Sequence, residues 1–437
     1  MKLGLSAKRM GAAAQVRRVG CGVLVAAVAL VLAPAAGAAG ATGWRVVPIA
    51  LGSGSVRLSG VSCTAANACT VVGDRATRAR DVGLAARWNG SRLVVQSTPA
   101  LRGIANFAFN AVACASARRC FAVGQYGYDK FGDADAFVAN WTGGGWIPGP
   151  LAGDAEYFDD TTAKSVSCIT ADDCFAVGFD ADENAAGSAP QGPEGTPSAG
   201  DENAEVWHWT GRGWHESQGV DPGIIPSDED FVPSNYWSTS VSCSGSRFCM
   251  DVGGSGPSLD NEPVGVELRD DDLSLTTSAS LPGAVTFNPQ RWNDNNLRAV
   301  ASNLPGTAST QINAVACGSP TSCEVVGDTN GLPPAVADGW NGKQWAAQTL
   351  PGAGASNLGA LSCPSSRRCV AVGTIGNRVL VDVWNGVTWA NQSAPTPAGA
   401  HQVDTGAVSC PTSGACLLVG YYSNAEGVRI PFAERYS

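Results

Sequence analysis

The sequence has little of what an enzyme active site usually contains. Among 437 residues it holds only three histidines, His208, His215 and His401. It has no Gly-x-Ser-x-Gly elbow, no His-Glu-x-x-His motif, no phosphate-binding loop and no dinucleotide-binding fingerprint. The enzyme classes that depend on these motifs are therefore not indicated, and the sequence favours a binding protein over an enzyme.

Helix signals are also missing. Outside the first 41 residues, no stretch combines an apolar period of 3.6 residues with helix caps. The chain instead contains 54 glycines and 25 prolines, which indicate many turns. With 44% hydrophobic residues it can still bury a large core, so we expect an all-β fold.

The first 41 residues are typical of a secretory signal peptide. A basic segment is followed by the apolar run 19–33 and then by small residues up to Ala41. An uncleaved membrane anchor is the alternative, but the run of about 15 residues is short of the ~20 that a bilayer requires. We therefore expect residues 1–41 to be removed and residues 42–437 to be secreted as one domain, without a membrane span.

The charge of the remaining chain argues against some partners. Removal of residues 1–41 takes away five basic and no acidic residues, which leaves 23 basic against 38 acidic side chains, a net charge of about −15. Nucleic acids and anionic membrane surfaces are poor partners for such a protein.

Fourteen of the fifteen cysteines form seven pairs at one spacing, Cys-x5-Cys. Zinc sites and redox pairs use shorter spacings, and a secreted protein favours oxidised sulfur. We therefore expect one disulfide in each repeat, across the mouth of a β-hairpin. The pairs are Cys63 and Cys69, Cys114 and Cys120, Cys168 and Cys174, Cys243 and Cys249, Cys317 and Cys323, Cys363 and Cys369, and Cys410 and Cys416.

A second hairpin motif follows most of these pairs. It places two large apolar residues five positions apart around a polar turn, as in "WNGSRL" at Trp88, "LRDDDL" at Leu268 and "WNGKQW" at Trp340. Two hairpins per repeat of 46 to 54 residues predict a seven-bladed β-propeller with four-stranded blades. Residues 44–49 are expected to supply the fourth strand of the last blade, a three-plus-one closure. An open solenoid or two separate sheets are the alternatives.

The motif "W(N/T)GxxW … VSCx5CxAVG" resembles the repeats of secreted, largely uncharacterised actinobacterial β-propeller proteins, and the resemblance covers nearly all of residues 42–437. The second hairpin is also similar to the Asp-box turn of sialidase-like propellers. However, this chain has Trp or Leu where that box carries Asp, and it lacks the Ser of the box. The second resemblance therefore implies topology only, and no catalytic residue is carried over.

Propeller geometry predicts where a ligand would bind. The stapled turns and the Trp turns share one face, which we call the stapled face. The loops between second and third strands and the connections between blades share the other, which we call the loop face. Three long insertions, after Cys174, Trp214 and Leu273, are all expected on the loop face over blades two to four.

Acidic residues are concentrated in the same insertions. Residues 179–240 contain twelve acidic residues and one basic residue, Arg212. "DADEN" offers Asp180, Asp182 and Asn184 as oxygen ligands for calcium, although the Gly and the distal Glu of an EF-hand are missing. A solvated acidic loop without a metal is the simpler alternative.

Aromatic residues on the loop face give a second candidate site. Flat rings beside carboxylates are typical of carbohydrate-binding surfaces, while packing between blades is the alternative. The candidate ligand-binding residues are Tyr126, Tyr128, Tyr157, Tyr236, Trp237, Asp228 and Asp230.

These observations predict a secreted, monomeric binding module for an extracellular glycan or protein, with calcium as its only candidate cofactor. A carbohydrate-active lyase or hydrolase that uses acid pairs such as Asp228 and Asp230 is the enzyme alternative. A structural protein of the cell envelope is the third hypothesis.

Overall fold

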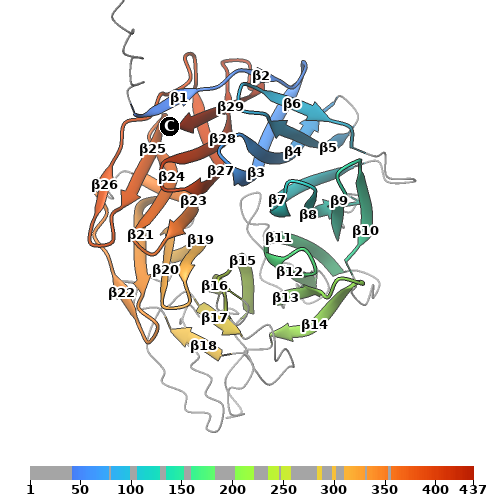
Figure 1. Ribbon diagram of the computed structural model, residues 1–437, viewed down its shortest axis with the longest axis vertical. Coiled ribbons are helices and arrows are strands. Elements are labelled where there is room, and N and C mark those ends of the chain that lie inside the picture. The colour runs from blue at the N-terminus through green and yellow to red at the C-terminus, as the bar shows by residue number, and fades with distance from the viewer. Residues whose placement is uncertain are drawn as a thin grey trace, which may run out of the picture. The chain divides into compact units, whose positions relative to one another are not determined.

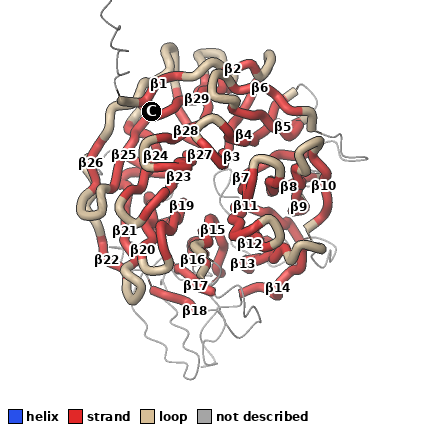
Figure 2. Tube along the Cα trace, in the orientation of Figure 1, coloured by secondary structure: helices blue, strands red, loops and turns tan. Residues whose placement is uncertain are grey.

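The computed structural model describes residues 42–77, 80–98, 106–127, 134–151, 159–182, 202–220, 235–245, 248–256, 283–287, 298–301, 310–329, 332–352 and 356–437. Residues 42–437 form one compact unit. Within the described ranges the regular structure is all β-strand (Figure 2). None of these residues belongs to a helix of the length and hydropathy that a membrane span requires.

The described strands of residues 42–437 form seven sheets that surround a common axis, and the four main strands of each sheet are antiparallel (Figure 1). The innermost strands are β3 (Ser55–Ala65), β7 (Phe107–Ser116), β11 (Asp159–Thr170), β15 (Asn235–Cys243), β19 (Thr310–Ser319), β23 (Ser356–Ser365) and β27 (Gln402–Thr412). The second strands are β4 (Ala68–Ala76), β8 (Arg119–Tyr126), β12 (Asp173–Asp182), β16 (Cys249–Gly256), β20 (Ser322–Thr329), β24 (Arg368–Ile375) and β28 (Ala415–Ser423).

The third and fourth strands form the outer half of each sheet, as a second hairpin in every sheet but the last, where β29 pairs with β1. The third strands are β5 (Asp81–Trp88), β9 (Asp135–Trp141), β13 (Glu202–Trp209), β17 (Gly283–Phe287), β21 (Leu332–Trp340), β25 (Arg378–Trp384) and β29 (Arg429–Tyr436). The fourth strands are β6 (Leu93–Gln96), β10 (Trp146–Pro150), β14 (Trp214–Val220), β18 (Arg298–Ala301), β22 (Trp345–Ala347), β26 (Trp389–Asn391) and β1 (Trp44–Val46). The predicted β-propeller with four-stranded blades is confirmed.

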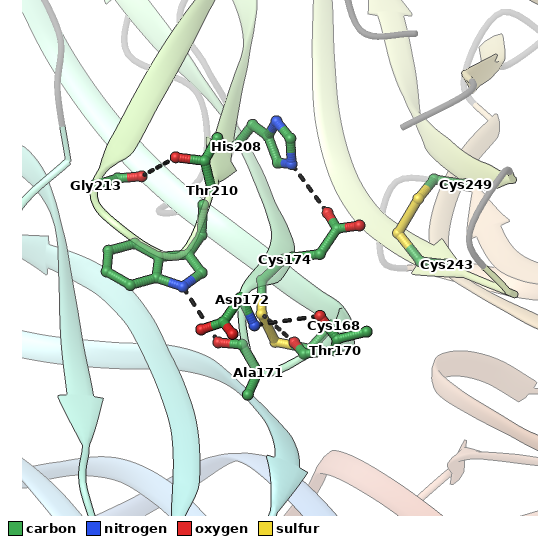
Figure 3. Close-up of polar contacts among 12 residues, drawn as sticks. Cys168, Thr170, Ala171, Asp172, Cys174, His208, Thr210, Gly213, Cys243 and Cys249 are labelled. Carbon is green, nitrogen blue, oxygen red and sulfur yellow. Dashed lines mark hydrogen bonds and ion pairs between the residues drawn. A yellow bond between two sulfur atoms is a disulfide. The ribbon is translucent and has the colours of Figure 1, made fainter. Parts of the chain in front are cut away.

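All seven predicted disulfides are present, each inside its own first hairpin. The tryptophan that ends the third strand covers the stapled turn. In the third sheet, the indole Nε1 of Trp209 donates to the carbonyl oxygen of Ala171 at 3.2 Å (Figure 3), and Trp88 does the same to Ala66 at 3.1 Å in the first sheet. The two sequence motifs therefore interlock at the stapled face.

A serine bond joins successive innermost strands. The residue before the first cysteine is serine in five repeats, and its Oγ accepts a hydrogen bond from the backbone N–H of the first cysteine of the next repeat, always at 3.0 Å. In the other two repeats this position holds Ala113 or Ala316, which have no hydroxyl. The five serines are Ser62, Ser167, Ser242, Ser362 and Ser409.

Six of the seven sheets can be followed with described side chains in all four strands. In the remaining sheet, β15–β18, the side chains of β17 and β18 are outside the description. Its innermost strand nevertheless lies between its sequence neighbours, because Cys243 binds Ser167 of β11 and Cys317 of β19 binds Ser242. The structure thus describes six blades in full, one fewer than the seven expected from the sequence.

The outer hairpin of this sheet is not the one expected from the sequence. The "LRDDDL" segment lies outside the described residues, whereas Phe287 at the end of β17 pairs with Cys249, the position that tryptophan takes in other sheets. The prediction of the hairpin at Leu268 is therefore wrong. Residues 288–297, between β17 and β18, lie outside the described residues.

Strand β1 closes the last sheet. Trp44 pairs with Tyr436 and Val46 with Glu434, as the three-plus-one closure predicts. The predicted range extended to Ile49, but Ile49 belongs to β2 (Ile49–Ala50), which pairs in parallel with Leu93 and Val94 of β6. After Val47 the chain therefore leaves the last sheet and covers the outer edge of the first.

Apolar side chains fill the space between neighbouring sheets. One such cluster joins Val71 of the first sheet to Leu417 and Val419 of the last, which are all at most 2% exposed. The hairpin tryptophans belong to these clusters, with Trp146 at 4% and Trp389 at 6% exposure. Their predicted packing role is confirmed for the described residues.

Candidate functional site

Every innermost strand contains a β-bulge four residues before its first cysteine. The residues at this position are Ser59, Asn110, Lys164, Thr239, Asn313, Gly359 and Gly406. The bulge moves the innermost strand toward a glycine four residues after the second cysteine. At Gly373, an added Cβ would overlap the carbonyl oxygen of Asn357 and lie 2.8 Å from the Cα of Leu358. The repeated Val-Gly dipeptide is therefore a requirement of close strand approach.

Four bulge side chains hydrogen-bond to the next sheet. Ser59 Oγ donates to the carbonyl oxygen of Phe109 at 2.5 Å, and Thr239 Oγ1 donates to that of Ile312 at 2.7 Å. The equivalent bonds from Nδ2 of Asn110 and Asn313 measure 3.0 and 2.9 Å. Because these bonds occur at the same position of each repeat, they hold neighbouring innermost strands in register. The cross-strand pairs that precede the bulges therefore lie at similar positions along the propeller axis.

Beyond the bulge, each sheet presents one cross-strand pair at the end away from the stapled turn. The pair consists of the residue six positions before the first cysteine and the residue five after the second. We call these seven pairs the mouth ring. They are Arg57 and Asp74, Ala108 and Gln125, Thr162 and Phe179, Trp237 and Gly254, Gln311 and Asp328, Asn357 and Thr374, and Asp404 and Tyr421.

The mouth ring is polar over the fifth, sixth, seventh and first sheets. Thr374 Oγ1 donates to Asn357 Oδ1 at 2.7 Å, and Asn313 Nδ2 donates to Asp328 Oδ2 at 2.7 Å. The second to fourth sheets contribute mostly apolar or small residues, such as Phe179. The chemistry of the ring is thus concentrated on one side.

A cavity of about 460 Å³ opens on this polar side. This volume is within the range of small-molecule and peptide-anchor sites. Gly376, in the turn between β24 and β25, places the cavity on the loop face. Its lining consists of Asp328, Asn357, Leu358, Gly359, Gly373, Thr374, Gly376, Gln402, Val403, Asp404 and Thr405.

Two ionisable groups at the cavity influence one another. Burial raises the pKa of Asp404, whereas a hydrogen bond from Tyr421 and the charge of Arg57 lower it. Burial and the negative charge of Asp404 raise the pKa of Tyr421 to about 12, so the phenol remains a hydrogen-bond donor at neutral pH. Asp404 is surrounded closely enough by protein for burial to raise its pKa, yet part of the residue is exposed and lines the cavity, where its carboxylate can accept further hydrogen bonds.

Two basic side chains, Arg57 of the first sheet and Arg429 of the last, are bound to Asp74. Arg57 Nε lies 2.5 Å from Asp74 Oδ1, and Arg429 Nη2 lies 3.5 Å from Asp74 Oδ2. Both the backbone N–H and the Nε of Arg429 also donate to Ser55 Oγ. Asp74 is only 2% exposed, so it needs these cationic partners.

Lys164 supplies another cation on an innermost strand. Its Nζ lies 5.0 Å from the centre of the Phe179 ring. Burial lowers the pKa of Lys164 to about 8, and the positive charge of Arg57 acts in the same direction. The positive charges of Arg57 and Lys164 thus repel one another, whereas the part of the cavity lining that the structure describes includes no basic side chain.

Carboxyl groups are also buried away from the cavity. Burial raises the pKa values of Glu434, Glu324 and Asp251 to about 8. Glu434 is fully buried, and neither of its carboxyl oxygens has a hydrogen-bond partner among the described residues. Such a group is held in its neutral form up to neutral pH.

We expect the stability of the protein to fall as the pH rises from about 4 to about 8. Carboxyl groups of the unfolded chain lose their proton near pH 4, whereas Glu434 keeps its proton to about pH 8 in the folded protein. Unfolding therefore releases a proton in this window, and the stabilising contribution present below pH 4 is lost at higher pH. Urea unfolding of Glu434→Gln should show a gain on the order of 2 kcal/mol at pH 8.5 and none at pH 4.

The control for this prediction is Glu426→Gln, because Glu426 is exposed in the turn before β29. It should leave the stability at both pH values unchanged. Parallel pH profiles for Glu434→Gln and the unsubstituted protein would contradict the assignment.

Of the predicted ligand-binding residues, Tyr126 is the one whose side chain is described. It packs against Phe137, with ring centres 6.0 Å apart, and burial and Asp135 raise the pKa of its phenol. Tyr236 and Trp237 are described only as backbone of β15, where Trp237 occupies a position of the mouth ring. Tyr128, Tyr157, Asp228 and Asp230 lie outside the described residues.

The side chains of the predicted calcium ligands also lie outside the described part of the structure. Asp180 and Asp182 belong to β12, where only their backbone is described, and Asn184 lies outside the description. Among the described residues, no group of three or more His, Cys, Asp or Glu side chains is arranged to hold a metal ion. The calcium site stays a prediction.

Both His208 and His215 lie in strands of the third sheet. His208 of β13 pairs with His215 of β14, and its Nε2 lies 2.9 Å from Asp173 Oδ1 (Figure 3). Its ring also stacks on Phe175, with centres 4.2 Å apart. His208 thus makes its contacts within its own sheet, at the stapled face and away from the cavity.

None of the residues that line the cavity was among the site residues predicted from the sequence. Asn357, Asp404 and Thr374 were not singled out, because they lie in blades without long insertions. A usable signal exists in the repeat itself: the sixth residue before each Cys-x5-Cys and the fifth after it. Reading these two positions down the seven repeats separates polar from apolar pairs.

No family model and no curated protein sequence matches this chain. Several solved structures share its fold. YCF48 bound to D1 peptide has a TM-score of 0.50 at 10% identity and covers 90% of this chain and 94% of its own. YCF48 from Cyanidioschyzon merolae has a TM-score of 0.50 at 12% identity, with coverage of 90% and 98%. The structure of U3-55K has a TM-score of 0.51 at 9% identity, also with coverage of 90% and 98%. At such low identity these similarities show the propeller fold alone.

Proposed function

We propose that this protein is a secreted, monomeric binding module that captures an extended peptide segment of an extracellular protein at the mouth of a seven-bladed propeller. The observation that carries the proposal is the cavity of about 460 Å³ on the loop face, which combines carboxylate, amide and hydroxyl groups. Concave sites with a few convergent polar groups are where propellers and other rigid scaffolds bind ligands.

The blade count of seven is part of this proposal. The sheet β15–β18 has its own disulfide and serine bonds to the sheets on both sides. Its innermost strand β15 contacts β11 on one side and β19 on the other. The series of neighbouring innermost strands closes where β27 contacts β3. Seven disulfides indicate an oxidising compartment, which supports export by residues 1–41.

The peptide class is favoured because the described residues that line the cavity include no aromatic side chain. Carbohydrate sites usually offer a flat ring to the sugar. YCF48, which shares the fold, was solved bound to a peptide. A glycan ligand is the second candidate, because Trp237 holds a mouth-ring position in the fourth sheet. The predicted surface with Tyr126, Tyr236 and Asp228 would serve that candidate.

Binding arrays test the proposal. The purified protein with its disulfides intact is applied to acetylated dodecapeptides of random sequence and to an oligosaccharide array, with and without calcium. We expect peptide binding that weakens at least about tenfold in Asp404→Asn, because a bond to a charged group is worth about 1.5–3 kcal/mol. Glu426→Gln makes the same charge change on an exposed turn and should bind like the unsubstituted protein.

The other outcomes would overturn the peptide proposal in distinct ways. Binding to glycans only, lost in Asp180→Ala/Asp182→Ala when calcium is present, would establish the carbohydrate alternative. Polysaccharide cleavage that is abolished by Asp228→Ala or Asp230→Ala would establish an enzyme. Absence of binding on both arrays would favour a structural role in the cell envelope.

A further inference from the structure

We propose that the cavity binds a positively charged group, the ammonium of a lysine or the guanidinium of an arginine in the captured peptide. This inference rests on the proposed function and names the chemistry of its ligand. Among the described residues, the lining contains two acidic residues, Asp328 and Asp404, and no basic residue. A cation is therefore the charged group for which this lining is complementary.

Asp328 forms the buried acidic wall. The residue is 4% exposed and still contributes to the surface of the cavity. The amide of Asn313 donates to its Oδ2 at 2.7 Å, and the same amide donates to the carbonyl oxygen of Leu358. The bulge of β19 thus fixes the position of this carboxylate before a ligand arrives, which lowers the entropic cost of binding.

Asp404 forms the accessible acidic wall. Tyr421, its partner in the mouth ring, donates a hydrogen bond to its carboxylate. One donated bond leaves acceptor sites on the two carboxylate oxygens for the N–H groups of a ligand. Burial raises the pKa of Asp404, whereas Tyr421 and Arg57 act in the opposite direction and favour its charged form, as a ligand cation beside the carboxylate would.

The protein's own cations leave room for this pairing. The guanidinium of Arg57 is held by Asp74 at 2.5 Å, and Arg429 is shared between Asp74 and Ser55. Neither arginine lines the cavity, so a ligand cation does not have to displace one of them. The acidic net charge of the whole chain, −10, also favours the approach of basic segments.

Size and surroundings indicate a peptide anchor instead of a free ion. A cavity of about 460 Å³ exceeds the volume of one side chain. Asn357, Thr374 and Gln402 add amide and hydroxyl groups that suit the backbone of an extended segment. We infer that one basic residue enters between the two carboxylates while its neighbours contact these polar groups.

A double-mutant cycle tests the inference. The tightest acetylated dodecapeptide from the array is compared with a copy in which one lysine or arginine is replaced by norleucine, by titration calorimetry. We expect the replacement to weaken binding to the unsubstituted protein at least about tenfold and binding to Asp404→Asn less than about threefold. Added salt should reduce the affinity of the charged peptide more than that of the neutral copy.

Tyr421→Phe provides a second variant that keeps the carboxylate. Loss of the phenol raises the pKa of Asp404. When the pH is lowered, Asp404 of the variant should therefore take up its proton, and lose the charged peptide, at a higher pH than Asp404 of the unsubstituted protein. If tight dodecapeptides carry no basic residue, or if norleucine is tolerated, the inference is wrong while the proposed function stands. If no dodecapeptide binds, the proposed function itself is wrong.

Discussion

Alanine at Gly373 is expected to prevent the protein from forming a stable ring. Its Cβ would overlap the carbonyl oxygen of Asn357 and approach the Cα of Leu358 to 2.8 Å, and both obstacles are backbone. Backbone atoms in the middle of a sheet cannot move aside as a side chain can. We expect a loss on the order of 4 kcal/mol, at the exceptional end for one substitution, measured as a shift of the urea midpoint or as loss of soluble protein.

The matched control is Gly144→Ala. Gly144 lies in the exposed turn between β9 and β10, and an added Cβ there has no atom within 4 Å. This variant should unfold within about 0.5 kcal/mol of the unsubstituted protein. Equal stability of the Gly373 and Gly144 variants would show that the bulge does not press the innermost strand against the second strand.

Alanine at Trp44 is expected to open the joint between the first and last strands of the ring. The indole is 6% exposed, lies 5.7 Å from the ring of Tyr436 and donates to Gln392 Oε1 at 2.9 Å. Removal of such a side chain from a packed site costs about 3–5 kcal/mol. Urea unfolding followed by tryptophan fluorescence should show this loss, with a lower unfolding midpoint.

Val46→Ala is the control on the same strand, because Val46 is 60% exposed. It should change the free energy of unfolding by less than about 0.5 kcal/mol. If Trp44→Ala unfolds at the same midpoint as Val46→Ala, then β1 contributes little to the ring, and the stability must come from the other contacts of the last sheet.

The architecture could be predicted from sequence because its signals are local and repeated. Cysteines six positions apart fix the first hairpin, and large apolar residues five apart indicate the second. The fourth sheet shows the limit of this method. "LRDDDL" satisfies the apolar spacing, but the third strand of this sheet is β17, in which Phe287 pairs with Cys249, and no local pattern reveals this pairing.

The site was harder to predict because its residues come together only when the ring forms. Asp328, Asn357 and Asp404 belong to three different sheets and lie 29 and 47 positions apart in the sequence. Long insertions drew attention to blades two to four, whereas the cavity lies over blades with short loops. The turn lengths predicted that a ligand would bind on the loop face, and the cavity does lie on that face.

The position of the disulfides determines how the protein responds to mechanical force. Every bridge spans six positions inside one hairpin, so no covalent bond links β1 to β29. Tension on the segment before residue 42 would act on the three paired residues of β1 first. The ring would open between β1 and β29 while all seven disulfide-bonded hairpins stayed intact. Only β1 would have to pair with β29 again to close the ring.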